Sequence, residues 1–302
     1  AGGMRADCTL PGKREPLGGE SCYAVTISGL QGGHSGGDIH LGRASANQVM
    51  GRVLYSAMER FHGLRLAAVS GGQFDNVICS RCDAVVALPT GSGAAFTAFI
   101  REFDAALKNE YAVTDPDVTL TCAAAETAKA VSAERTVTLV QALTAMPQGV
   151  EAMDTDFPGL VQTSLNMGVV KLDGDGLHIA FSIRSSIASR KLMLAQRVRA
   201  VAALAGGTVA ERGVYPGWQY KRESQFRDTL LAAYKDLTGK DGVVEATHGG
   251  LECGLLMEKI PGLDAVSMGP ELHDVHSVRE RLSVPSTERT YELVCELLRR
   301  SC

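Results

Sequence analysis

Long apolar runs are missing from this 302-residue sequence. No stretch of about 18 uninterrupted apolar residues occurs, which excludes a conventional membrane-spanning helix. The N-terminal segment also lacks the apolar core and small-residue cleavage site of a signal peptide. Basic runs are missing too, because 30 Lys and Arg face 34 Asp and Glu for a net charge of −4. We therefore expect a cytoplasmic protein whose main partners include neither nucleic acid nor a membrane.

The eight cysteines lack the regular spacing of a disulfide framework. In a chain of this size, scattered cysteines indicate reduced cytosolic thiols. Cys79 and Cys82 have the C-x-x-C spacing of zinc and redox motifs, but no second pair at similar spacing accompanies them. We therefore predict a structural role for these two thiols.

Short strands alternate with amphipathic helices along the chain, which predicts an α/β protein of about two domains. The middle section repeats a β-α-β-β-α-β pattern, and the last third alternates strands and helices in the manner of a parallel sheet. We place domain boundaries near Glu20 and Gly207. The expected strands are 23–30, 64–70, 83–88, 118–124, 163–172, 177–184, 209–214, 242–247 and 264–268. The expected helices are 44–60, 94–111, 133–146, 189–205, 224–237, 250–259 and 286–299.

A glycine-rich segment surrounds His34 and Ser35, at residues 32–38. Glycines let the backbone approach a ligand closely because no side chain stands in the way. An imidazole in such a loop can donate a hydrogen bond to a developing oxyanion. The alternative is a glycine-rich turn with an incidental histidine, and we favour the functional interpretation.

The same segment satisfies the G-x-S-x-G motif of serine hydrolases around Ser35. With Asp264 and His276 downstream, the order is that of an α/β-hydrolase triad. That fold needs a helix directly after the serine and several strands before it. Gly36 and Gly37 disfavour such a helix, so a serine hydrolase is a minority hypothesis.

Two loops and one arginine complete the candidate chemistry. Residues 248–254 and 269–277 each follow an expected strand, where ligands of α/β sheets bind. His276 is a candidate metal ligand, or else a surface imidazole. Arg184 ends the expected strand 177–184 and could hold a carboxylate bidentately, or else simply be solvated.

Together these segments resemble the aminoacyl-histidine dipeptidases, or cytosolic non-specific dipeptidases. These are two-zinc metallopeptidases related to aminoacylase and glutamate carboxypeptidase. The matching segments are 27–40, 71–76, 163–168, 215–218, 248–254 and the loop of His276 and Ser277. The resemblance implies a partial zinc-peptidase catalytic domain with a mostly parallel sheet and an inserted α+β lid domain. Residues 1–20 would be a remnant of the catalytic domain, 21–207 the lid and dimerisation domain, and 208–302 the C-terminal part of the catalytic domain.

The resemblance also implies roles for five residues. His276 matches the last metal ligand of the family, on zinc. His34 matches the catalytic lid histidine that stabilises the tetrahedral intermediate, in many relatives from the partner subunit. Asn76 matches a lid asparagine that reaches the active site, and Arg184 matches the arginine that holds the substrate's terminal carboxylate. Glu252 lies in a family-typical segment and either binds substrate or orders the loop.

The sequence departs from the family at the metal site. The reaction needs two metals about 3.5–4 Å apart, which the family binds with a His-x-Asp motif, a bridging Asp, a Glu-Glu pair and a further Asp. None of the seven histidines here is followed two places later by Asp, and no two acidic residues are adjacent. One imidazole cannot hold two zinc ions. We therefore expect an N-terminally truncated fragment that is inactive alone.

The full enzyme would hydrolyse dipeptides, of the Xaa-His type or non-specifically, and form a homodimer through the lid domain. A non-catalytic, lid-type dimerisation module is the alternative hypothesis.

Overall fold

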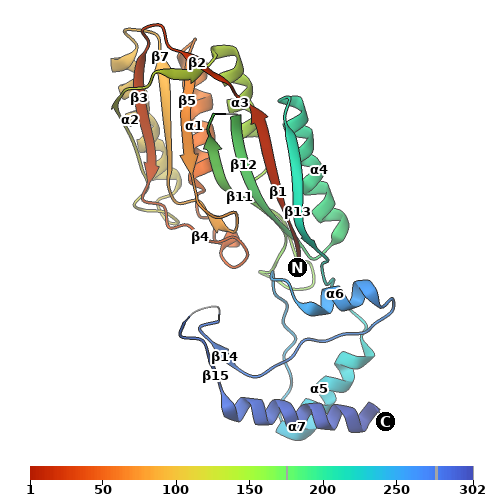
Figure 1. The fold of residues 1–302 in the computed structure, drawn as a ribbon. Coiled ribbons are helices and arrows are strands. Elements are labelled where there is room, and N and C mark those ends of the chain that lie inside the picture. The colour runs from red at the N-terminus through yellow and green to blue at the C-terminus, as the bar shows by residue number, and fades with distance from the viewer. Residues whose placement is uncertain (175, 276–277, 302) are drawn as a thin grey trace.

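The computed structural model describes residues 1–174, 176–275 and 278–301. Its main feature is a nine-stranded sheet of order β13-β1-β12-β11-β5-β7-β3-β8, with β10 paired to β11 (Figure 1). All of its pairings are antiparallel. The strands are β1 (Gly2–Pro11), β3 (Ser21–Ser28), β5 (Arg65–Gly71), β7 (Cys82–Leu88), β8 (Thr119–Ala125), β10 (Gly149–Met153), β11 (Val161–Leu172), β12 (Gly176–Ser185) and β13 (Thr208–Tyr215).

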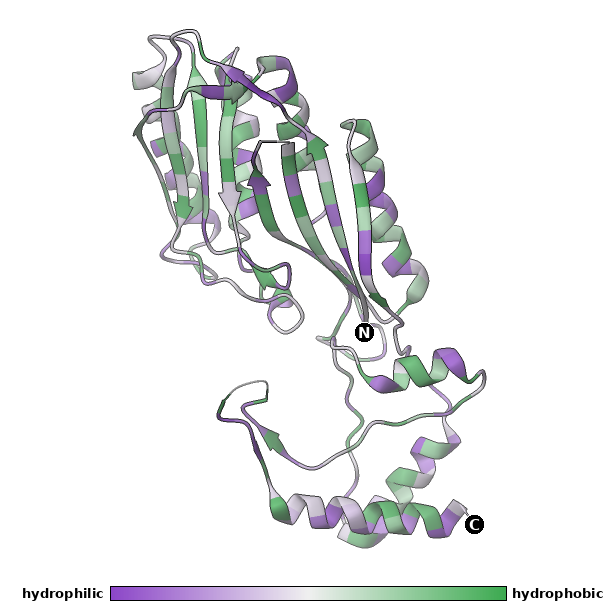
Figure 2. Ribbon diagram, in the orientation of Figure 1, coloured by the Kyte–Doolittle hydropathy of each residue, from purple (hydrophilic) through white to green (hydrophobic). Residues whose placement is uncertain are grey.

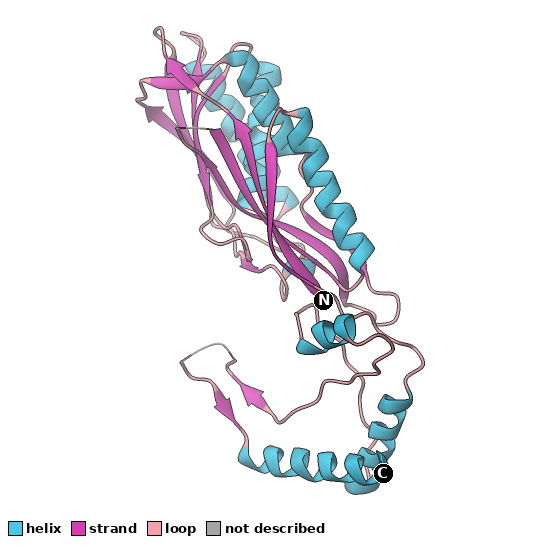
Figure 3. Cartoon of the chain, turned by 45° about the vertical axis from the view of Figure 1, so that its right-hand side comes forward, coloured by secondary structure: helices cyan, strands magenta, loops and turns pink. Residues whose placement is uncertain are grey.

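Four helices cover one face of this sheet, as the turned view of Figure 3 also shows. They are α1 (Ala46–Arg60), α2 (Gly93–Glu110), α3 (Ala133–Ala145) and α4 (Ala188–Leu204). Each buries one apolar side against the strands. On α2, for example, the ring of the buried Phe96 lies 5.4 Å from that of Tyr23 on β3, centroid to centroid. The sheet and these helices enclose the main hydrophobic core.

The sheet consists of two repeats of one topology. Repeat A (residues 21–125) runs β3-α1-β5-β7-α2-β8, and its strands lie in the order β5-β7-β3-β8. Repeat B (residues 2–11 and 133–215) runs β1-α3-β11-β12-α4-β13, and its strands lie in the equivalent order β11-β12-β1-β13. The repeats meet through their equivalent strands β11 and β5, where Val170 pairs with Gly71. Repeat A is therefore inserted between the first strand and first helix of repeat B.

Strand β1 was not expected, because residues 1–20 were assigned to a different domain. It pairs with β12 along its whole length and with β13 on its other side. Its inward side chains alternate strictly, and Met4, Ala6, Cys8 and Leu10 are each 5% exposed or less. The sheet thus extends past both expected boundaries, to residues 2 and 215. The division of the chain into a lid and a catalytic part stays a prediction.

Residues 216–301 hold three helices and one small hairpin in the part that the structure describes. These are α5 (Gln225–Thr238), α6 (Glu252–Lys259), α7 (Val284–Ser301), β14 (Leu272–His273) and β15 (Arg281–Leu282). Leu230, Ala233 and Leu297 form a small core between α5 and α7. Figure 2 shows apolar stretches on α6 and α7 as well as along the sheet, and on these helices Leu256 and Leu298 are exposed.

The parallel sheet expected after residue 208 is absent from the described residues. Segments 242–247 and 264–268 are not strands, and the strand pairs formed by β13 and by β14 and β15 are antiparallel. A strand needs a neighbour for its N–H and C=O groups. These two segments have none in this structure, and Val243 is 82% exposed. Their apolar, β-branched composition misled the prediction because pairing, rather than propensity, decides strand formation.

Two short strand pairs and one 3₁₀ helix lie beside the sheet. β2 (Arg14–Pro16) pairs with β9 (Lys129–Val131), and β4 (Gly33–His34) pairs with β6 (Val77–Ile78). A 3₁₀ helix, η1 (Ile39–Leu41), follows β4. Within the described ranges, no helix combines the length and apolar character needed to cross a bilayer.

Candidate functional site

The His34 loop (residues 29–45, between β3 and α1) is fastened to the β5–β7 connection. His34 pairs with Val77 in the β4–β6 ladder, and the Ser35 amide donates to the Asn76 carbonyl at 2.9 Å. The His34 amide donates to Asp38 Oδ2 at 2.8 Å. These bonds bring two predicted site residues, His34 and Asn76, next to each other.

The imidazole of His34 is held by backbone amides of its own loop. Its Nδ1 lies 3.3 Å from the Gly36 nitrogen and 3.1 Å from the Gly37 nitrogen. Desolvation, and then the nearby Arg184 charge, lower the pKa of His34, while Asp38 opposes them. The ring therefore favours its neutral form.

Arg184 also lies close to Gly36, near the same point as the imidazole. A Cβ atom on Gly36 would lie 3.0 Å from His34 Cε1 and 3.4 Å from Arg184 Cζ. A side chain at this position would crowd both of these groups. The Nε of Arg184 is buried and has no hydrogen-bond partner among the described residues. A buried guanidinium N–H without a partner is a donor available to a ligand.

Asn166 on β11 is a site residue that the sequence analysis did not single out. Its buried Nδ2 donates to the carbonyls of Asp75 and Val77, each at 2.8 Å, on the two sides of Asn76. Next to it, a Cβ on Gly168 would lie 2.5 Å from the Phe74 carbonyl oxygen. The segment 163–168 matches the family in sequence. Its contact with the loop before β6 is between residues far apart in the chain, so no local sequence pattern predicts it.

His248 joins the C-terminal segment to the sheet. Its Nε2 lies 2.8 Å from Ser164 Oγ, and both residues are buried. Ser164 pairs with Arg184 across β11 and β12. Burial lowers the pKa of His248 to about 4, and the Arg184 charge adds to this effect.

Two other predicted residues are not brought to this cluster. Glu252 is the first residue of α6 and is exposed; no described contact joins it to His34 or Arg184. His276 lies outside the described residues. In the described part of the chain, no group of three or more His, Cys, Asp or Glu side chains could hold a metal ion. The described residues therefore do not fit the two-zinc centre that the resemblance implies.

Among the described residues, the geometry of a serine hydrolase is not formed around Ser35. Ser35 follows a two-residue strand and precedes a turn and η1, rather than standing between a sheet strand and a helix. Asp264 accepts hydrogen bonds from Ser224 Oγ at 2.8 Å and the Phe226 amide at 3.1 Å. The Oγ of Ser35 is buried without a partner in the described structure, so no base activates it there.

Cys79 and Cys82 are free, buried thiols. Cys79 Sγ donates to the Arg81 carbonyl at 3.0 Å, and burial raises the pKa of this thiol to about 11. Burial also raises the pKa of the Cys82 thiol well above its usual range. Protonated, enclosed thiols suit the structural role predicted for them.

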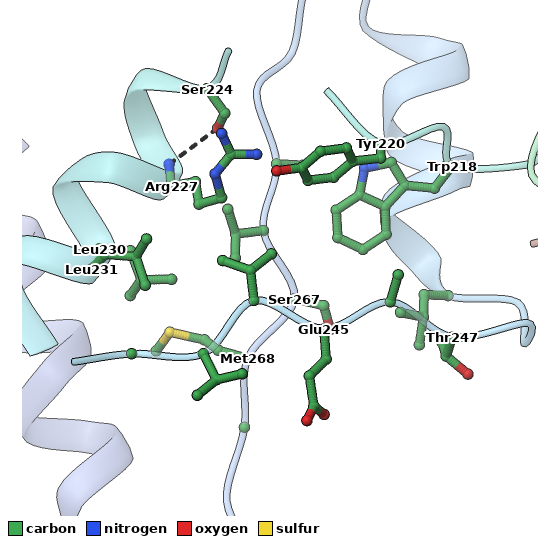
Figure 4. Close-up of a pocket in the computed structure, with 18 of the residues that line it drawn as sticks. Trp218, Tyr220, Ser224, Arg227, Leu230, Leu231, Glu245, Thr247, Ser267 and Met268 are labelled. Atoms are coloured by element: carbon green, nitrogen blue, oxygen red, sulfur yellow. Dashed lines mark hydrogen bonds between the residues drawn. The ribbon is translucent and has the colours of Figure 1, made fainter. Parts of the chain in front are cut away.

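A separate cavity of about 990 Å³ lies between the end of the sheet and the C-terminal helices (Figure 4). Aromatic residues line one side, where the Phe157 and Tyr220 rings meet edge to face at 4.8 Å between centroids. The Arg227 guanidinium lies 5.0 Å from the Tyr220 ring centroid and donates to the backbone carbonyl of Lys221. His34, Asn76, Arg184 and Glu252 do not line this cavity, whereas Asp264 does. The half-buried Arg227 guanidinium at its wall already has a backbone acceptor. The size of the cavity alone therefore does not make it the reaction site.

The repeat A strands and the His34 loop define a recognised class of domain. Residues 25–115 match the family model described as a peptidase dimerisation domain. The chain is 33% identical over 302 residues to a cytosol non-specific dipeptidase of Escherichia coli strain K12, covering 99% of this chain and 62% of that protein. The crystal structure of an aminoacylhistidine dipeptidase from Vibrio alginolyticus matches with a TM-score of 0.92 and 30% identity, over 99% of this chain and 61% of that one.

These findings confirm the resemblance to the aminoacyl-histidine dipeptidases. The similarity runs through both repeats and the C-terminal segment, since nearly the whole chain is aligned. The chain spans about three fifths of the length of these two relatives.

Proposed function

We propose that this chain forms the substrate-binding side of a metal-dependent dipeptidase. The observation that carries the proposal is the placement of His34 and Arg184 beside Gly36, both within 3.4 Å of the position that a Cβ there would take. Arg184 offers a buried donor without a partner among the described residues, and the His34 imidazole lies close to it. Together they complement the terminal carboxylate and the peptide carbonyl of a dipeptide. The names of the two relatives point to the same substrate class.

Arg184 binds the terminal carboxylate of the dipeptide in this proposal. A guanidinium presents two parallel N–H groups that match a carboxylate, and a charged pair of this kind is stronger than a neutral hydrogen bond. Its Nε, which has no partner among the described residues, gains one when the carboxylate binds. The carboxylate is the common feature of all free dipeptides, so the contact selects for length rather than side chain.

His34 then donates to the scissile carbonyl oxygen. Its help grows as that oxygen gains negative charge, because a fixed donor stabilises the tetrahedral oxyanion more than the ground-state carbonyl. Asn76, whose backbone carbonyl accepts from the Ser35 amide, contributes a further polar side chain in this proposal.

Zinc would supply an activated water, and the family resemblance implies His276 as one of its ligands. The described residues do not fit a two-zinc centre. We propose that the metal-binding groups are not supplied by the described residues, and that the chain by itself does not cleave dipeptides. Chelator-sensitive hydrolysis by the purified chain would contradict this part of the proposal.

The site combines both repeats within one chain. His34 and Asn76 belong to repeat A, and Arg184 and Asn166 belong to repeat B. We propose that the two repeats, from residue 2 to 215, act together as the lid, and that residues 216–302 belong to the catalytic part. A homodimer through the lid stays a proposal, as does the cytosolic location in the name of the Escherichia coli relative.

The experiment is a calorimetric titration of the chain with a dipeptide and with the same dipeptide as its C-terminal amide. We expect the free dipeptide to bind and the amide, which lacks the carboxylate charge, to bind far more weakly. In the Arg184→Met variant the two ligands should bind equally weakly. Equal binding of both ligands to the unmodified chain would overturn the proposal, and an inactive, stable dimer that binds neither would favour the non-catalytic module.

A further inference from the structure

We propose that the backbone amides of Gly36 and Gly37 are a tautomer lock, which holds His34 in its neutral form with the proton on Nε2. The lock makes the neutral side chain a hydrogen-bond donor through Nε2, because its Nδ1 is occupied by the two amides of its own loop. The use of that donor on a substrate carbonyl rests on the proposed function above. The lock itself is a property of the chain and is measured without substrate.

The hydrogen-bond pattern at Nδ1 admits one tautomer. The two amides point their N–H groups at this nitrogen, from 3.3 Å for Gly36 and 3.1 Å for Gly37. A nitrogen that accepts two N–H groups must present its lone pair, so it cannot carry a proton of its own. In a neutral imidazole the proton is then on Nε2.

The charges around the ring act in the same direction. Protonation would place an N–H on Nδ1 against two amide hydrogens, and a positive charge beside the Arg184 guanidinium. Asp38 is the one nearby carboxylate that favours protonation. Its Oδ2 accepts from the His34 backbone amide, and Arg43 Nη1 lies 3.9 Å from the same atom. The negative charge of Asp38 is thus shared with groups other than the ring.

The two glycines differ in what they permit. At Gly36 any side chain would meet both the His34 ring and Arg184, since a Cβ would lie 3.0 Å and 3.4 Å from them. At Gly37 a Cβ would have no atom nearer than His34 Nδ1 at 3.8 Å, and the backbone is not in the left-handed region. Alanine therefore fits at Gly37 and keeps the amide N–H, whereas proline removes it.

A neutral donor suits the chemistry better than a cation. An imidazolium beside Arg184 would attract any anion, including the carboxylate of a product, in its ground state. A neutral N–H binds an uncharged carbonyl modestly and gains strength as charge develops on the oxygen. The two residues then have different roles. Arg184 provides the charge that binds the carboxylate, and His34 provides the N–H that donates to the carbonyl oxygen.

Nitrogen NMR of the chain with ¹⁵N-labelled histidine tests the lock directly. Long-range proton–nitrogen correlations distinguish a protonated ring nitrogen from one with a lone pair, and His34→Gln identifies the His34 signals by their loss. At neutral pH we expect a protonated Nε2 and an unprotonated Nδ1. A protonated Nδ1, or the averaged mixture typical of free histidine, would overturn the inference.

The variants Gly37→Pro and Gly37→Ala assign the cause. We expect Gly37→Ala to retain the Nε2–H pattern and Gly37→Pro to shift His34 towards the averaged mixture, with the amide spectrum of the sheet unchanged in both. A Gly37→Pro variant that keeps the unaltered pattern would show that the amides are not the cause. If Gly37→Pro does not fold, the spectrum of the unmodified chain still decides the tautomer. A locked tautomer in a chain that binds no dipeptide would refute the proposed function and leave this inference standing.

Discussion

Ser164 and His248 share a buried hydrogen bond of 2.8 Å between Oγ and Nε2. It joins β11, in the middle of the sheet, to the loop before α6. Because Ser164 pairs with Arg184, the bond also connects the C-terminal segment to the candidate substrate-binding residues. A change in the charge of His248 should therefore alter both the free energy of unfolding and the position of the candidate substrate-binding residues.

The first prediction concerns pH. The pKa of His248 falls from 6.5 to about 4 in the folded chain, chiefly through burial. The unfolded chain takes up this proton near pH 6.5, and the folded chain takes it up only near pH 4. The contribution of neutral His248 to the free energy of unfolding is therefore complete above pH 6.5 and is lost as the pH falls towards 4. The loss should approach about 3 kcal/mol. Chemical unfolding across this range, for the unmodified chain and His248→Gln, measures it. An identical pH slope in the two proteins would contradict the assignment.

The second prediction concerns Arg184→Lys. Lysine keeps the positive charge but presents a point charge instead of a planar fork, so it cannot hold a carboxylate bidentately. We expect dipeptide binding about tenfold weaker, equivalent to about 1.4 kcal/mol. Calorimetry measures the change, with Arg190→Lys on the exposed face of α4 as the control. Full affinity in Arg184→Lys would mean that charge alone, without geometry, binds the carboxylate.

A third prediction concerns Asn166, which holds the backbone on both sides of Asn76. Asn166→Ala leaves the Asp75 and Val77 carbonyls without these donors, and should lower the free energy of unfolding by about 2–4 kcal/mol. Asn109→Ala, on the exposed end of α2, should change it by less than about 0.5 kcal/mol. Thermal and urea unfolding provide the comparison. Equal changes in the free energy of unfolding for the two variants would show that Asn166 does not hold this backbone.

Gly168 gives a fourth prediction, about the close approach of two backbones. A Cβ there would meet the backbone of Phe74 and Asp75 at 2.5–2.6 Å. Gly168→Ala should therefore force the segment before β6 away from β11, at a cost of about 1–3 kcal/mol, and weaken dipeptide binding with it. Gly174→Ala is the matched control, because its Cβ would have no neighbour within 4 Å. A neutral Gly168→Ala would show that the two segments are not packed as described.

Local sequence patterns predicted most of repeat A and repeat B. The apolar spacing of α2 and the Asp-Gly turn between β11 and β12 are complete within short windows, and both elements lie within about two residues of their expected ends. The glycines around His34 also marked the loop as special. In each case the deciding information is carried by neighbours in the sequence.

Features that depend on distant segments were not predicted. Strand β1 is fixed by pairing with β12, some 170 residues away, and Asn166 by carbonyls about 90 residues away. The same dependence explains the error at 242–247, where a strand-like composition has no partner strand in the described structure. The proximity of Arg184 to His34 likewise follows from the way repeat A is inserted into repeat B.

We propose above all that His34 and Arg184 form one binding site beside Gly36. The most direct measurement is a dipeptide titration followed by NMR of the ¹⁵N-labelled chain, observing the Nε signals of Arg184 and the Nε2 signal of His34 together. The account predicts that both move with a single dissociation constant, and that the dipeptide amide moves neither at the same concentrations. Movement of only one signal, or of neither while other residues respond, would contradict it.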